Sequence, residues 1–356
     1  MKERVIAGLR DAGFSALALI VGLGVGAGLM LIYGYDPVRA YMALFTGSFG
    51  TVEQFAETLA FAVPLMLTGI TFAIGVKAGL FNIGAEGQMY MGAIGAVIFG
   101  GLLKLPPGVH TVVAMFGAML FGLLWSIGPA LLKVYRGVHE VISTIMFNWM
   151  AYWFVMYLAK YVVVDPNKPE RTITVYESAR LPVLVRGASL TAAIYVSILF
   201  CIVVFLFLTL TRLGFELRLY GANPSAAHYA GVKVWRVVLA SFIIGGLAAG
   251  LAGGLQIIGR PPTWALYATL GNVAGLGFEG IGVALIGRNN PIGVILASIF
   301  YGALQNGGRL MQYEAGVYAE FVRAISGLII IALAVPEAVT LIRIHLMRKL
   351  RRWRVT

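Results

Sequence analysis

Two long apolar runs are separated by the sequence Ala78-Gly-Leu-Phe-Asn-Ile-Gly-Ala-Glu-Gly-Gln-Met89. This stretch places an amide, a carboxylate and several glycines between segments that are suited to lipid. A carboxylate at membrane depth costs about 2.5 kcal/mol or more, so it usually has a function or a partner. Glycines beside it allow a helix to break and to expose its backbone groups to a cavity. The stretch therefore predicts a broken membrane helix beside a path for a solute.

The composition of the whole chain also favours lipid as its surroundings. Of 356 residues, 60% are hydrophobic and 12% are charged, whereas a soluble domain has about 25% charged residues. The mean hydropathy is +0.87. Most of the apolar runs reach the roughly 17–25 residues that a spanning helix needs. These runs cover residues 14–33, 58–76, 87–103, 111–132, 141–159, 187–211, 237–259, 261–278, 291–308 and 317–335.

These runs predict an all-α integral membrane protein with about ten transmembrane helices, folded as a single transmembrane domain over residues 1–356. The basic residues lie in short segments between the runs, which is the pattern that orients membrane proteins. With ten crossings and a cytoplasmic N-terminus, seventeen of the 27 Lys and Arg residues fall on the inside. We therefore expect both termini and the connector 212–236 to be cytoplasmic, and the polar loop 164–186 to be extracellular.

The break in the first half of the chain has a loose counterpart in the second half. Ala78–Gly87 is echoed by Ala274-Gly-Leu-Gly-Phe-Glu279-Gly280, again between apolar runs. Transporters often carry paired, Gly-interrupted segments of this kind, with the substrate where the two halves meet. One interpretation is an inverted repeat with broken helices near 78–88 and 272–282. Coincidence in a Gly-rich chain is the alternative.

Polar residues inside the apolar runs are the candidates for contact with a solute. A neutral polar solute must exchange its hydrogen bonds to water for bonds to protein, and amides provide these without net charge. For the two glutamates, helix N-capping or a structural hydrogen bond to a neighbouring helix is an equally good interpretation. The candidate pathway residues are Asn82, Glu86, Gln88, Asn148, Asn272 and Glu279.

Motifs for covalent chemistry are not found in this sequence. It has no Gly-x-x-x-x-Gly-Lys-[Ser/Thr], so a P-loop for ATP is not expected. Gly275–Gly280 matches Gly-x-Gly-x-x-Gly but lies in apolar sequence without a βαβ context. His139-Glu140 lacks the second histidine of a zinc-protease helix, and Cys201 is the single cysteine. We therefore expect no enzyme activity, no metal site and no cofactor in this chain.

The connector on the expected cytoplasmic side carries a helix-start pattern. Asn223 is a favourable N-cap and Pro224 is preset for the first turn. The pattern predicts a short helix over Ser225–Ala230, ended by Gly231. Such a capped helix is suited to insert into a groove of a partner protein. An amphipathic helix lying on the membrane surface is the alternative.

Three stretches resemble the motifs of a known family, the ABC importer permeases for branched-chain amino acids, simple sugars and nucleosides. They are Gly79-Leu-Phe-Asn-Ile-Gly-Ala-Glu-Gly-Gln-Met89, Gly137-Val-His-Glu-Val-Ile-Ser-Thr-Ile-Met-Phe-Asn148 and Leu217-Arg-Leu-Tyr-Gly-Ala-Asn-Pro-Ser-Ala-Ala-His-Tyr-Ala-Gly-Val232. The second is most similar to the nucleoside branch, which works with a lipoprotein of the basic-membrane-protein type. The resemblance covers essentially the whole chain.

The resemblance implies a multi-pass protein of a bacterial or archaeal plasma membrane that works in a larger assembly. The implied partners are a second permease subunit, a cytoplasmic ATPase that holds ATP and Mg²⁺, and a solute-binding lipoprotein. The segment Asn82–Gln88 would line the path, and Asn223–Gly231 would be the coupling helix. The implied ATPase-docking residues are Arg218, Gly221, Asn223, Pro224, Ala227, Tyr229 and Gly231.

Three other interpretations remain open at this point. The same assembly could carry a simple sugar or riboflavin, because the motifs define the transporter better than its cargo. An ion-driven secondary transporter would use its intramembrane carboxylates as proton or sodium sites and would need no docking helix. A purely structural membrane subunit would leave the paired glutamate segments unexplained.

Overall fold

The computed structural model of this protein describes residues 20–318, 320–328 and 331–332. It divides into two compact units. Unit 1 comprises the chain up to Gly50 and from Leu304 onward, and unit 2 runs from Thr51 to Ala303. The basic N-terminal residues and the basic C-terminal tail, on which the predicted positions of the termini depend, lie outside the described residues.

Unit 2 is built almost entirely from helices, as predicted. Helix α3 (Val52–Lys77) ends at the central break, and α4 (Ala85–Gly101) begins after it. The remaining helices are α5 (Val109–Arg136), α6 (Glu140–Tyr157), α7 (Ala193–Leu210), α8 (Arg212–Ala222), α9 (Pro224–Tyr229), α10 (Val234–Ile258), α11 (Leu276–Ile286) and the first part of α12 (Pro291–Ala315). A π-helical turn, Leu158–Val162, extends α6, and a 3₁₀ turn covers Glu177–Ala179. The strands β1 (Val164–Asp165) and β2 (Lys168–Thr172) form a small antiparallel hairpin.

Among the described residues, five helices are long and apolar enough to cross a membrane. The number rises to six if α11 and α12, which are bent by 119° at a short break, form one span. The all-α membrane class is therefore confirmed, whereas the predicted count of ten is not.

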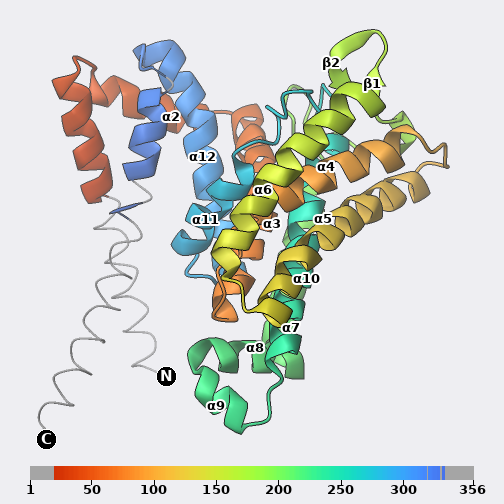
Figure 1. Cartoon of the computed structure of the whole chain (residues 1–356). Coiled ribbons are helices and arrows are strands. Elements are labelled where there is room, and N and C mark those ends of the chain that lie inside the picture. Colours follow the sequence, from red (N-terminus) through yellow and green to blue (C-terminus); the bar gives the residue numbers. More distant parts are fainter. Residues whose placement is uncertain (1–19, 319, 329–330, 333–356) are drawn as a thin grey trace, which may run out of the picture. The chain divides into compact units, whose positions relative to one another are not determined.

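Helix α10 occupies the centre of unit 2 and packs against α3, α4 and α5 (Figure 1). The contacts are close because glycines face one another. A methyl group at Gly250 would lie 2.5 Å from the carbonyl oxygen of Ala118 and 3.0 Å from the Cα of Gly122. Small residues four apart allow such close approach between helix backbones. The glycines of α10, a helix of the second half of the chain, therefore allow α3, α4 and α5 of the first half to pack closely around it.

The two halves of unit 2 exchange helices across this centre. Helix α4, from the first half, packs against α10, and α11, from the second half, packs against α3. Gly280 of α11 lies directly on Thr68 of α3, whose Oγ1 donates to the carbonyl of Leu276 at 3.1 Å. The segments 78–88 and 272–282 meet where Gly275 N–H donates to Glu86, and their relation as an inverted repeat stays a prediction.

One predicted span, residues 261–278, is wrong as a continuous helix. The chain is irregular from Gly259 to Gly275, and α11 begins only at Leu276. Pro261 and Pro262 lack the N–H groups that a helix would use, and Trp264 and Leu270 have positive φ. The irregular backbone bonds instead to strand β2 and the residues after it, for example where the Thr172 N–H of β2 donates to the Leu266 carbonyl at 2.9 Å.

Unit 1 contains a short apolar helix, Ile20–Ile32, together with α2 (Pro37–Phe49) and the second part of α12. Asp36 caps α2 by accepting from the N–H groups of Val38 and Arg39. Asn306 of α12 donates to the Gly47 carbonyl at 2.9 Å. Residues 320–328 are helical where described, and Phe321 packs on Tyr33 and Tyr35.

Candidate functional site

The predicted break in the first half is present between α3 and α4. Helix α3 ends at Lys77, residues 78–84 are not helical, and α4 begins at Ala85. Gly79 takes a φ of +67°, a left-handed conformation that glycine adopts without strain. The N–H of Leu80 closes the turn onto the Gly75 carbonyl at 2.9 Å. In the second half, the predicted break falls where the irregular chain gives way to α11 at Leu276.

Asn82 and Gln88 are brought together at the start of α4, and both are fully buried. Asn82 Oδ1 accepts from the Gly84 N–H at 3.0 Å and from Gln88 Nε2 at 3.4 Å. Asn82 Nδ2 and Gln88 Oε1 have no hydrogen-bond partner among the described residues. Buried polar atoms are nearly always bonded, so an unbonded donor beside an unbonded acceptor needs an explanation.

Asn148 of α6 holds both sides of the same segment. Its Nδ2 donates to the Ile83 carbonyl at 2.9 Å, and its Oδ1 accepts from the Gly87 N–H at 2.8 Å. Because Gly87 has no side chain, the amide of Asn148 reaches the backbone of α4 directly. Asn148 therefore fixes the position of the irregular segment relative to α6.

Glu86 links the first half of the chain to the second. Its carboxylate is 3% exposed and accepts from the N–H groups of Gly275, Gly277 and Phe278 at 2.5, 2.7 and 3.3 Å. The Tyr90 hydroxyl donates to the same carboxylate. These N–H groups form the free N-terminus of α11, which carries a partial positive charge. Of the two interpretations left open for Glu86, the structure shows the capping contact with a neighbouring helix.

Asn82, Glu86, Gln88 and Asn148, which surround the irregular segment, are called the Asn82 cluster below. The other two predicted pathway residues lie apart from it. Asn272 organises the irregular loop, because its Nδ2 donates to the Ala265 carbonyl and its Oδ1 accepts from the Tyr267 N–H. Glu279 is half-buried in the first turn of α11. The structure thus joins Asn82, Glu86, Gln88 and Asn148 around one segment and places Asn272 and Glu279 on the elements beside it.

Glu140 is a contact of this segment that sequence reasoning missed. It is 4% exposed, forms an ion pair with Lys133 at 2.8 Å, and accepts from the Phe81 N–H at 3.4 Å. The sequence offered one signal for the ion pair: Glu140 follows Lys133 by seven positions, with the Gly137 turn between α5 and α6 in between. Glu140 therefore attaches the irregular segment to the α5–α6 corner.

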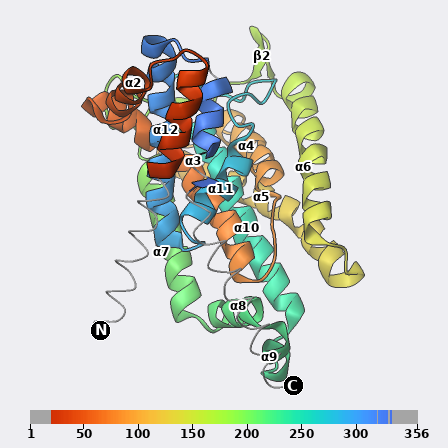
Figure 2. The ribbon, with the colours of Figure 1, turned by 90° about the vertical axis from the view of Figure 1, so that its left-hand side faces the viewer.

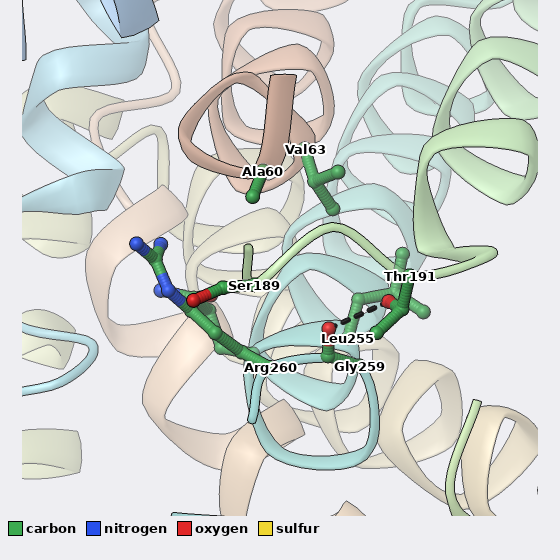
Figure 3. Close-up of a pocket in the computed structure, with 8 residues that line it drawn as sticks. Ala60, Val63, Ser189, Thr191, Leu255, Gly259 and Arg260 are labelled. Carbon is green, nitrogen blue, oxygen red and sulfur yellow. Dashed lines mark hydrogen bonds between the residues drawn. The ribbon is translucent and has the colours of Figure 1, made fainter. Parts of the chain in front are cut away.

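The end of α10 closes a small recess beside the chain that leads into α7, where Ser189 and Thr191 line it (Figure 3). Arg260 forms an ion pair with Glu57 of α3 at 3.1 Å, and its guanidinium lies 4.1 Å from the centre of the Phe61 ring. Thr191 donates to the Gly259 carbonyl at 2.6 Å. The recess has a volume of about 10 Å³, which is room for about one water molecule and far below the roughly 300 Å³ of a ligand pocket.

The predicted docking segment lies at the opposite end of unit 2 from the hairpin (Figures 1 and 2). Asn223 caps α9 by accepting from the Ala226 N–H at 3.1 Å, and Gly231 follows the helix with a φ of +77°. The helix pattern read from the sequence is therefore confirmed. Tyr229 is 93% exposed and Ala227 is fully buried. Arg218, Asn223 and Pro224 are exposed, and Gly221 is half-buried.

A family model described as "Branched-chain amino acid transport system / permease component" matches residues 54–334. The chain belongs to this permease family. The permease is 36% identical over 338 residues to the guanosine ABC transporter permease protein NupP of Bacillus subtilis, covering 94% of this chain and 96% of that protein. It is 31% identical to the nucleoside ABC transporter permease protein NupB of Lactococcus lactis, covering 90% and 89%. It is 32% identical to the glucose ABC transporter permease protein TsgB13 of Haloferax volcanii, covering 91% and 87%.

The relatives of this permease also occur in pairs. The guanosine permease protein NupQ comes from the same Bacillus strain as NupP, and the nucleoside permease protein NupC from the same Lactococcus strain as NupB. These two are 27% and 26% identical to the present chain. Paired permease subunits are thus a feature of the relatives.

Proposed function

We propose that this permease is the membrane subunit of an ATP-driven ABC importer for nucleosides. The observation that carries the proposal is its 36% identity to a guanosine permease over 94% of the chain. The similarity to a second nucleoside permease over 90% of the chain supports it. The permease would form the path, and the covalent chemistry of ATP hydrolysis would take place in another subunit.

The Asn82 cluster supports a path for a solute rich in hydrogen-bonding groups. Asn82 Nδ2 is a donor and Gln88 Oε1 an acceptor, and neither has a partner among the described residues. A nucleobase edge offers a complementary acceptor and donor, so the solute would satisfy atoms that are costly to leave unbonded. The cluster is closed in this structure, and transport would require a change in helix arrangement. Glu86, Asn148, Asn272 and Glu279 would line or position the same path.

The assembly that we propose has three kinds of partner. The exposed surface formed by Arg218 of α8, the cap residue Asn223, and Pro224 and Tyr229 of α9 would dock on a cytoplasmic ATPase that holds ATP and Mg²⁺. A second permease chain would complete the path, as the paired relatives suggest. A solute-binding lipoprotein would approach the hairpin end of unit 2. In the proposed orientation both termini would be in the cytoplasm of a bacterial or archaeal cell.

The function can be tested by uptake into proteoliposomes that contain the assembled importer. We expect ATP inside the vesicles to drive accumulation of labelled guanosine or uridine in the presence of the binding protein. Accumulation should persist when the proton gradient is collapsed with an uncoupler. Uptake that needs the gradient but not ATP would instead establish a secondary transporter.

Glucose is a second candidate cargo because TsgB13 is 32% identical to this chain. A competition experiment separates the two. We expect a tenfold excess of unlabelled nucleosides to suppress guanosine uptake, by simple mass action at one site, and the same excess of glucose to leave it unchanged. Strong glucose uptake without guanosine uptake would reassign the cargo and leave the ATP-driven mechanism intact.

The pathway role of the cluster predicts a specific phenotype for Asn82→Ala. The substitution removes the unbonded donor and shortens the side chain without adding charge. We expect a loss of about tenfold in uptake, the effect of one lost hydrogen bond of roughly 1.4 kcal/mol, with a normal yield of assembled complex. Wild-type uptake together with lower thermal stability would assign Asn82 to structure only.

A further inference from the structure

Helix α8 meets the chain at the end of α3 through the backbone atoms of Gly221 and Gly79. Gly221, in the last turn of α8, lies against the Lys77 carbonyl and the Gly79 backbone, and a methyl group at Gly221 would lie 2.8 Å from Gly79 N. In the opposite direction, a methyl group at Gly79 would lie 3.1 Å from the Gly221 Cα. No flexible side chain stands between the two segments. Either methyl group would therefore have to displace backbone.

The α8 side of this contact is a stiff element. Thr211 caps α8 by accepting from the Gly214 N–H at 3.0 Å, and Gly214 itself packs on the backbone of Phe207 and Leu208 in α7. Leu217 is fully buried. Asn223 is both the residue that follows α8 and the N-cap of α9. A displacement of α9 therefore moves Gly221 with it.

The α3 side of the contact leads directly into the Asn82 cluster. Two residues beyond Gly79, the Phe81 N–H is held by Glu140, and the Ile83 carbonyl is held by Asn148. The chain then enters α4, where Glu86 binds the N-terminus of α11. The segment Ala78–Gly84 is thus connected to α8 at one end and to α6, α4 and α11 along the rest.

We infer that the Gly79–Gly221 contact is the joint through which motion of α8 and α9 enters the membrane helices and shifts Ala78–Gly84. The inference rests on the docking of the ATPase on α9 proposed above, and adds the residues that carry the motion inward. Close-packed backbone has no free volume to absorb a displacement, so the contact passes it on. Glu140 and Asn148 act as positioning residues, because they hold the far side of the segment that the joint moves.

The resemblance names Gly221 among the docking residues, but its Cα faces the Lys77 carbonyl and the Gly79 backbone, so the variant Gly221→Ala tests the joint, and retention of the ATPase tests whether Gly221 also acts in docking. The variant leaves the exposed face of α9 unchanged and adds one methyl group against the backbone of α3. We expect the ATPase to co-purify in the wild-type ratio and to hydrolyse ATP at its basal rate, while uptake falls about tenfold, within the range reported for changes in coupling residues. Gly28→Ala is the matched control, since a methyl group there meets nothing within 4 Å, and its uptake should be unchanged.

Two results with Gly221→Ala would overturn the inference. Uptake at the wild-type level would show that the close contact is not needed, and loss of the ATPase would show that Gly221 acts in docking. Tyr229→Asp supplies the comparison, because it alters the 93% exposed ring of α9 and should release the ATPase. If Tyr229→Asp retains both the ATPase and full uptake, the docking proposal itself fails.

A measurement on the unaltered importer tests the joint even if Gly221→Ala does not accumulate. Amide hydrogen exchange is compared with and without a non-hydrolysable ATP analogue. We expect exchange to change in residues 222–230 and also in residues 78–84, where the Phe81 amide is held by Glu140. A change confined to residues 222–230 would overturn the joint and leave docking in place.

Discussion

At the residue scale, Glu86 shows how one carboxylate can be accommodated in the interior of a helical bundle. Three backbone N–H groups of α11 and the Tyr90 hydroxyl surround it. The charge therefore finds its partners in a helix N-terminus rather than in a basic side chain. The glutamate that marked the candidate path in the sequence is also the tie between the two halves of the protein.

This tie predicts a graded loss of stability. Glu86→Ala leaves three backbone N–H groups without acceptors, and each costs about 1–3 kcal/mol when buried. Tyr90→Phe removes one donor only and should cost about 1 kcal/mol. We expect thermal unfolding in detergent to show a much larger fall in Tm for Glu86→Ala than for Tyr90→Phe. Equal Tm values for the two variants would contradict the capping role.

The ion pair between Lys133 and Glu140 gives a second prediction at this scale. Glu140→Gln keeps an oxygen that can accept from the Phe81 N–H but loses the attraction to Lys133, whereas Glu140→Ala loses both. Removing one partner of a largely buried pair is more costly than the pair is worth. We expect uptake and Tm to fall in the order wild type, Gln, Ala. An alanine variant as active as the glutamine variant would show that the Phe81 bond is unimportant.

At the element scale, the glycines of α10 decide how closely the helices pack. Gly250→Ala would push a methyl group into the backbone of α5, 2.5 Å from the Ala118 carbonyl oxygen. Overpacking of this kind costs about 1–3 kcal/mol or more. Gly28→Ala adds the same group in open space and should be neutral or slightly stabilising, because alanine favours a helix over glycine by up to about 1 kcal/mol. Thermal unfolding of both variants checks this.

The same scale shows which elements could be read from the sequence. Local patterns were sufficient where the cause is local: Asn223 and Pro224 start α9, and the Gly-rich stretch after Lys77 interrupts the helix. The prediction of a helix over residues 261–275 was wrong because it rested on hydropathy. The apolar composition was right, but Pro261, Pro262 and the positive-φ residues Trp264 and Leu270 prevent a helix there. The Glu86 contact with Gly275 joins residues 189 positions apart, and no local pattern contains that pairing.

The same distinction applies to the candidate site. Asn82, Gln88 and Glu86 could be found because a polar residue in an apolar run is conspicuous. Glu140, Glu57 and Arg260 were missed because they stand at the ends of such runs, where a charge is ordinary. Their importance depends on the partner that each meets in the fold, Lys133 for the first and one another for the other two.

At the scale of the whole molecule, the hairpin loop and the irregular loop after α10 are joined by backbone bonds. The N–H groups of Thr172 and Val175 donate to the carbonyls of Leu266 and Trp264, each at 2.9 Å. In the opposite direction, the Ala268 N–H donates to the Glu170 carbonyl at 2.9 Å. A protease site introduced at Asn167, in the exposed connection of the hairpin, should be cleaved without release of either fragment, because α10 and α11 after the cut pack against α3, α4 and α5 before it. We expect the cut protein to elute as one species in mild detergent and as two in SDS. Separation in mild detergent would contradict this.

The exchange of helices between the halves has a consequence for how the protein is made. When α3 and α4 leave the ribosome, the helices that cover them, α11 and α10, have not yet been synthesised. Glu86 lacks its backbone donors until Gly275–Phe278 emerge, nearly two hundred residues later. The early helices must therefore wait in the bilayer, or with the insertion machinery, in an unfinished state. The core of this permease can therefore form only after Phe278 has been synthesised, which makes a chain terminated before that point a substrate for quality control rather than a functional fragment.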